Sequence, residues 1–151
     1  MKLSLRMAAV FICIYSFMIV APPAFAEDPG AGPSAENQGP SCILVVTYFH
    51  TTARCYTCHK IEELSALAVK SYFEDELKRG RVVWRVINVD EPENRHFVKD
   101  YNLYTKHVIV SEIKDNQEVR WKDLKDVWTL VRNEEKFGNY VQTEISDWLK
   151  E

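Results

Sequence analysis

The chain of 151 residues carries 19 lysines and arginines against 22 aspartates and glutamates, which gives a formal net charge of −3. This near balance, without a basic block interleaved with aromatic residues, excludes nucleic acid as an expected partner. No internal repeat is present, and the length allows one ordinary hydrophobic core but not two.

Residues 1–26 have the pattern of a secretory signal peptide. Lys2 and Arg6 precede an apolar run from Met7 to Val20, and small residues end the segment at Ala26. The run holds about 14 residues, whereas a membrane-spanning helix needs about 20. We therefore predict cleavage after Ala26, a periplasmic or secreted location, and no stable membrane anchor in the mature chain.

Residues 27–41 are rich in Pro, Gly, Ala and Ser, and we expect them to form a disordered linker. The folded domain then spans residues 42–151. Its first element is a strand over 42–50, because the near-continuous apolar run indicates burial on both faces. From about Tyr56 apolar residues recur at helical spacing, and the predicted helix ends at Gly80, a residue that helix C-termini favour.

A second strand is predicted over residues 82–89, which are mostly β-branched or aromatic. Asp90 is expected to cap a short helix that runs to Lys99 or Tyr101. Strands over 108–110 and 118–121 then follow, and the turn-like residues between them indicate a hairpin.

The last part of the chain, 124–149, has helical periodicity, and either Asn133 or Gly138 is expected to divide it. The predicted order is therefore β-α-β-α-β-β-α. A helix between the first two strands requires a parallel pair with a right-handed crossover, and the hairpin adds an antiparallel edge. We predict an α/β fold with a mixed four-stranded central sheet and helices on both faces. The core is expected to include the tryptophans at positions 84, 121, 128 and 148.

The chemistry is expected at the sequence Cys55-Tyr56-Thr57-Cys58, which lies between the first strand and the first helix. Two cysteines three positions apart at a helix start are able to close a disulfide. The free N–H groups and the dipole of the helix stabilise the first sulfur as a thiolate, the species that attacks disulfides. We predict Cys55 as the nucleophile, Cys58 as the resolving thiol, and Arg54 as a cation that supports the thiolate.

A strand followed by CxxC and a helix, in this element order, resembles the thioredoxin fold. The segments 86–90 and 101–103 look like the thioredoxin pattern of a strand ending in Val-Asp and a short helix leading to a tyrosine. More closely, residues 48–58, with Ile61-Glu62-Glu63, resemble the ArsF-type thioredoxin-like proteins, small secreted bacterial proteins labelled nitrophenyl compound nitroreductase subunits. The similarity extends to 121–128 and Phe137. The resemblance implies disulfide exchange, with protein thiols or disulfides or a membrane electron-transfer partner as substrates.

Three positions depart from ordinary thioredoxins. Arg54 replaces the tryptophan usually found before the first cysteine, His107 aligns with the cis-proline that faces the disulfide, and Thr47 falls near the buried aspartate. A histidine at position 107 would shuttle protons or make the thiol site sensitive to pH. His50 at the strand end is a candidate base or orienting group, and His59 is a candidate cation beside the cysteines.

Several alternatives remain open. The first is an adaptor or binding subunit whose disulfide is only structural. The sequence from Cys55 to His59 also has the spacing of a c-type haem attachment site, and Cys55, Cys58, His59 and His50 offer four ligands for zinc or copper. Against haem, the mature chain has no methionine to serve as a second axial ligand, and a strand runs directly into the motif. Against a metal, the chain has no second CxxC. We therefore expect no cofactor and no metal. Cys42 is expected to be a free thiol, with intermolecular pairing as its alternative. Oxidant, reductant and isomerase roles all stay open.

Overall fold

The computed structural model describes residues 42–150 of the chain. The predicted signal peptide and linker lie outside the described residues. The elements along the described part are β1 (Cys42–His50), α1 (Tyr56–Tyr72), α2 (Glu74–Lys78), β2 (Val82–Asn88), the 3₁₀ turn η1 (Pro92–Asn94), α3 (His96–Asp100), β3 (His107–Lys114), β4 (Gln117–Asp123), α4 (Val127–Leu130) and α5 (Glu134–Leu149).

The four strands form one mixed sheet in the order β2-β1-β3-β4. β1 pairs in parallel with β2 and antiparallel with β3, and β3 and β4 form the predicted hairpin. Asp115 and Asn116 at its tip have φ of 50° and 62°, left-handed values that Asp and Asn tolerate and that tight hairpin turns require. The thioredoxin-like fold class predicted from the sequence is confirmed.

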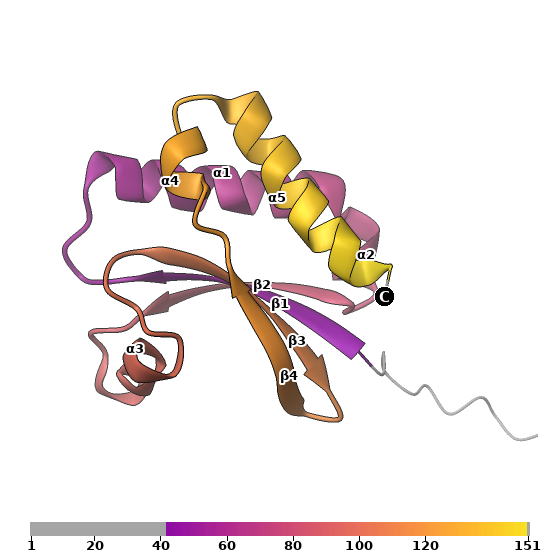
Figure 1. Ribbon diagram of the computed structural model, residues 1–151, viewed down its shortest axis with the longest axis horizontal. Coiled ribbons are helices and arrows are strands. Elements are labelled where there is room, and N and C mark those ends of the chain that lie inside the picture. The colour runs from indigo at the N-terminus through magenta and orange to yellow at the C-terminus, as the bar shows by residue number, and fades with distance from the viewer. Residues whose placement is uncertain (1–41, 151) are drawn as a thin grey trace, which may run out of the picture. The chain divides into compact units, whose positions relative to one another are not determined.

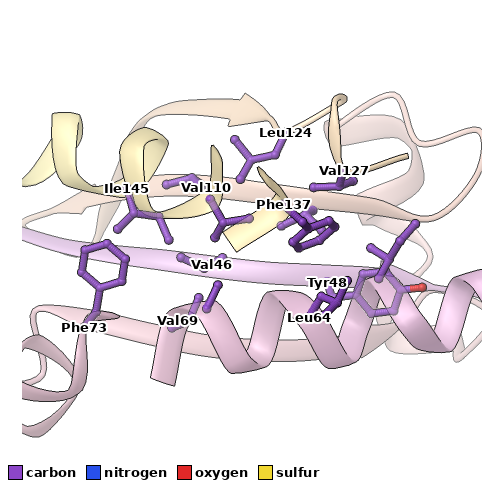
Figure 2. Close-up of a cluster of buried hydrophobic side chains, with 14 of the residues drawn as sticks. Val46, Tyr48, Leu64, Val69, Phe73, Val110, Leu124, Val127, Phe137 and Ile145 are labelled. Carbon is purple, nitrogen blue, oxygen red and sulfur yellow. The ribbon is translucent and has the colours of Figure 1, made fainter. Parts of the chain in front are cut away.

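Helices cover both faces of the sheet. α1 and α5 lie together on one face, and α3 lies on the other (Figure 1). Between the sheet and α1 and α5 is the main core, where Figure 2 shows Phe137 among side chains of β1, β3 and α1. A smaller cluster under α3 contains Phe49, Val89, Leu103 and Ile109. Its position explains why β1, the central strand, is apolar on both sides.

Some boundaries differ from the prediction. The first helical segment is two helices, because the chain turns at Phe73, whose φ of −127° is not helical and whose side chain is buried in the main core. Gly80 does end the segment, with a φ of 71°. Asn133 divides the last segment by capping α5, and its side-chain oxygen accepts from the Lys136 N–H at 2.9 Å. Gly138 lies inside α5.

Two other expectations are wrong. Asp90 caps no helix, because its carboxylate instead accepts a hydrogen bond from the Thr52 N–H at 2.7 Å, and η1 has no side-chain cap. Trp121 is not in the core: it lies on β4, an edge strand, and is 43% exposed.

A buried carboxylate connects the far ends of β1, β3 and β4. Glu112 is 3% exposed and accepts from Cys42 Sγ at 3.1 Å, Lys114 Nζ at 2.9 Å and Arg120 Nε at 2.5 Å. The hydrogen bond from Lys114, with those from Cys42 and Arg120, lowers the pKa of Glu112 to about 2, although burial acts to raise it. Burial and Glu112 in turn raise the pKa of Cys42, which forms no disulfide with another cysteine among residues 42–150.

The hydrogen bonds to Glu112 make the free energy of unfolding depend on pH in the acid range. Because the folded pKa of about 2 lies below the ordinary value of 4.5, the stabilisation by Glu112 is fully present above pH 4.5 and is lost as the pH falls toward 2. Glu112→Gln is expected to lower the free energy of unfolding by about 1–3 kcal/mol at pH 6. Denaturant titrations should show this difference shrinking below pH 4.5. The exposed control Glu93→Gln should change little at either pH, and an equal loss at pH 6 and pH 2.5 would contradict the assignment.

Candidate functional site

The cysteine pair lies where β1, an interior strand of the sheet, passes into α1, the longest helix among residues 42–150. Cys55 is the N-cap of α1, its backbone is extended, and its sulfur accepts a hydrogen bond from the Cys58 N–H at 3.1 Å. The two cysteines form a disulfide with their Cα atoms 5.0 Å apart. Cys55 is exposed, whereas Cys58, one turn further along, is only 2% exposed. The pair therefore has an accessible sulfur and an enclosed one.

Tyr48 holds the backbone of the second cysteine by a hydrogen bond. Its side chain is fully buried, and its hydroxyl donates to the Cys58 carbonyl at 2.7 Å. Burial raises the pKa of Tyr48, and the neighbouring Arg54 acts in the opposite direction. Sequence analysis missed this residue. The available signal was its alternation with Val46 on the helix-covered face of β1, which directs the ring toward the first turn of α1.

Arg54 lies beside the cysteines as predicted, but it is paired. Its guanidinium forms an ion pair with Glu62 of α1 and lies 5.6 Å from the centre of the Tyr48 ring. Arg54 Nε is buried and has no hydrogen-bond partner among the described residues. Glu62, which sequence analysis did not treat as a site residue, therefore offsets much of the positive charge next to Cys55.

The loop that leads into the motif is fastened to the end of β2. The Asp90 carboxylate accepts from the Thr52 N–H, and Asn88 Nδ2 donates to Thr52 Oγ1 at 3.2 Å. The hydrogen bond from Thr52 lowers the pKa of Asp90 below its ordinary value. Two polar contacts from the neighbouring strand thus fix the chain three residues before Cys55.

A groove runs alongside the disulfide, and we call it the disulfide groove. One wall contains Ala53, Arg54, Cys55 and Cys58, and the other contains Thr105, Lys106 and Trp128. Trp128 Nε1 donates to the Lys106 carbonyl at 2.9 Å, which holds the second wall together. Trp128 was expected only in the core. It packs against the core and also presents surface to the groove.

His107 is buried at the start of β3 and is held on both sides of its ring. Nδ1 donates to Asp123 Oδ2 at 2.9 Å, and Nε2 accepts weakly from the N–H groups of Tyr104 and Thr105, at 3.3 and 3.4 Å. These partners assign the neutral tautomer with its proton on Nδ1. His107 is not among the residues that line the disulfide groove, where Thr105 and Lys106 face the sulfurs. No cis peptide bond occurs between residues 42 and 150.

The other two candidate histidines, His50 and His59, lie near the motif without lining the groove. His59 is exposed on the first turn of α1, where its N–H donates to the Cys55 carbonyl. His50 stacks on Tyr48, and its Nδ1 donates to the Thr51 carbonyl at 3.0 Å. Of the four predicted supporting residues, the structure therefore brings only Arg54 into the groove beside the cysteines. The catalytic roles of all these residues stay predictions.

Within residues 42–150, no three or more His, Cys, Asp or Glu side chains are grouped so as to hold a metal ion. No helix in the same range is long and apolar enough to cross a membrane.

The sequence of the chain was compared with protein families and with curated proteins. No protein family matches the chain by sequence, and no curated protein matches it either. The site is a disulfide at the N-terminus of α1, and both of its cysteines line an open groove.

Proposed function

We propose that this protein is an exported thiol–disulfide oxidoreductase that acts through Cys55 and Cys58. The observation that carries the proposal is the position of Cys55, whose exposed sulfur accepts the Cys58 N–H at the start of α1. In the reduced protein the same N–H group and the helix dipole would stabilise a thiolate on Cys55. The resemblance to the secreted ArsF-type thioredoxin-like proteins supports the same function and the predicted export.

The exchange proceeds in two steps. The Cys55 thiolate attacks one sulfur of a partner's disulfide, so a mixed disulfide forms and the partner's other sulfur leaves as a thiolate. The Cys58 thiolate then attacks the Cys55 sulfur, which closes the Cys55–Cys58 disulfide and releases the partner's second thiolate. Two electrons pass to the partner, and the reverse sequence oxidises a dithiol. Protein thiols and disulfides, or a membrane electron-transfer partner, are the proposed substrates.

The alternative function is an adaptor subunit in which the disulfide only braces the start of α1. The neutralisation of Arg54 by Glu62 favours this alternative, because a paired arginine stabilises a thiolate less than a free one. The surface that would receive a substrate also differs from the one predicted from the sequence, because Thr105 and Lys106 line the groove and His107 does not. The two functions differ in whether the disulfide opens under physiological reductants.

A redox titration against glutathione separates them. We expect the pair to open and close in one two-electron transition, with a potential between about −270 and about −120 mV. Trapping free thiols at each glutathione ratio measures the transition, and Cys42→Ser should leave it unchanged. A disulfide that stays closed at ratios where thioredoxin-like proteins are reduced would reject the oxidoreductase in favour of the adaptor.

A further inference from the structure

The disulfide groove continues into two further hollows. The first, of about 320 Å³, shares Thr105 and Trp128 with the disulfide groove and is also lined by Tyr104, Asp123 and Lys125. The next shares those last three residues and extends to Tyr101, Trp121 and Lys122. Because neighbouring hollows share walls, they form one path from the sulfurs to the end of β4. We call the part beyond the disulfide groove the lateral groove.

The charge along this path is mostly positive. Arg54, Lys106, Lys122 and Lys125 line it, and Asp123 is the one acid among the lining residues of the three hollows. Arg54 is paired with Glu62, and Lys122 donates to Glu144 at 2.6 Å. Lys106 and Lys125 take part in no ion pair found among residues 42–150. The positive charge of Lys106 does help to lower the pKa of Asp90. After these pairings Lys106 and Lys125 remain as cations along the path, and the Asp123 carboxylate there accepts from His107.

Two aromatic side chains beside these lysines are exposed to solvent. Tyr104 is 77% exposed and Trp121 is 43% exposed. The Trp121 ring is held edge-on against Tyr101, with ring centres 5.2 Å apart, so it is positioned although exposed. Exposed Tyr and Trp held in place are the residues that protein interfaces use as anchors, since they bury large area with little loss of side-chain entropy.

We propose that the lateral groove binds an extended, acidic segment of the redox partner, adjacent in sequence to the partner's reactive cysteine. This inference rests on the proposed disulfide exchange, which places the partner's sulfur at Cys55. A chain that starts there and follows the connected hollows meets Lys106 and Lys125 in turn and reaches Trp121. Acidic side chains complement the two lysines, and an apolar or aromatic side chain at the far end would pack on Trp121.

The inference is tested with short synthetic peptides that contain one disulfide and differ only in the flanking segment. The acidic peptide is expected to exchange with the purified protein about tenfold faster than its basic counterpart, and the preference should weaken as salt rises. Lys125→Glu should remove most of the preference. The control Lys70→Glu makes the same charge change on an exposed residue in the last turn of α1, outside all three hollows, and should keep it.

A second measurement separates binding from chemistry. Acidic peptides with serine in place of cysteine are titrated against the protein, and calorimetry reports binding, so that the signal does not depend on Trp121. Trp121→Ala should weaken binding about tenfold, whereas Val119→Ala, a half-exposed position on the same strand that lines none of the three hollows, should not.

The outcomes distinguish this inference from the proposed function. Suppose that acidic and basic peptides exchange equally fast and bind equally well, while oxidised glutathione exchanges normally. This result would overturn the proposal that the lateral groove binds an acidic segment, and it would leave the proposed oxidoreductase function intact. Failure of all exchange would reject the oxidoreductase. In that case selective binding of the acidic serine peptides would still support the groove, and unselective binding would overturn it.

Discussion

Replacing Cys55 with serine is expected to reduce disulfide exchange to the uncatalysed background. A serine hydroxyl has no accessible anionic form comparable to a thiolate, so the first attack on the partner's disulfide is lost. Cys58 is 2% exposed and its carbonyl is fixed by Tyr48, so it is poorly placed to replace Cys55 as the attacking residue. Insulin reduction and exchange with oxidised glutathione both measure the loss.

Cys58→Ser should behave differently, because the exposed sulfur of Cys55 remains. This variant is expected to accumulate a mixed disulfide with its substrate, since the resolving thiol is missing. Non-reducing electrophoresis and mass spectrometry detect the adduct. Cys42→Ser is the matched control and should exchange as the wild type does, because Cys42 lies at the opposite end of β1 and donates to Glu112. Equal activity of Cys55→Ser and the wild type would remove Cys55 from the mechanism.

Phe137→Ala is expected to destabilise the fold by about 3–5 kcal/mol. Phe137 is fully buried where α5 packs on α1 and the sheet, so its removal leaves a cavity that the surrounding strands and helices fill poorly. The free energy of unfolding from denaturant titration measures the loss. Leu67→Ala, at a position 57% exposed on α1, is the control and should change stability by less than about 1 kcal/mol. A loss below about 1 kcal/mol for Phe137→Ala would contradict the packing of α5.

Most of the fold was predictable because its signals are local. The apolar run of β1 and the turn residues of the β3–β4 hairpin each define an element from neighbouring residues alone. The break at Phe73 was not predictable, because helical periodicity continues across it. The chain turns there only because the ring is buried in a core built from distant segments.

The cysteine pair was also predictable, since the motif and the start of α1 are contiguous in sequence. The groove opposite it was not. Thr105, Lys106 and Trp128 come from two later segments, and the hydrogen bond from Trp128 to the Lys106 carbonyl joins them. Two acids that set the local charge were also missed. The ion pair between Arg54 and Glu62 and the hydrogen bond between His107 and Asp123 become evident only in the folded structure.

The amino-acid order alone determined which segments become strands and helices, and it determined that two thiols meet at a helix start. These outcomes depend on hydrophobic spacing and on backbone groups within a few residues of each other. Only the tertiary structure decided which cations are neutralised and which surface lies opposite the disulfide. Those properties arise where the start of α1, the segment before β3 and α4 converge, and spacing along the chain does not encode the distances between such segments.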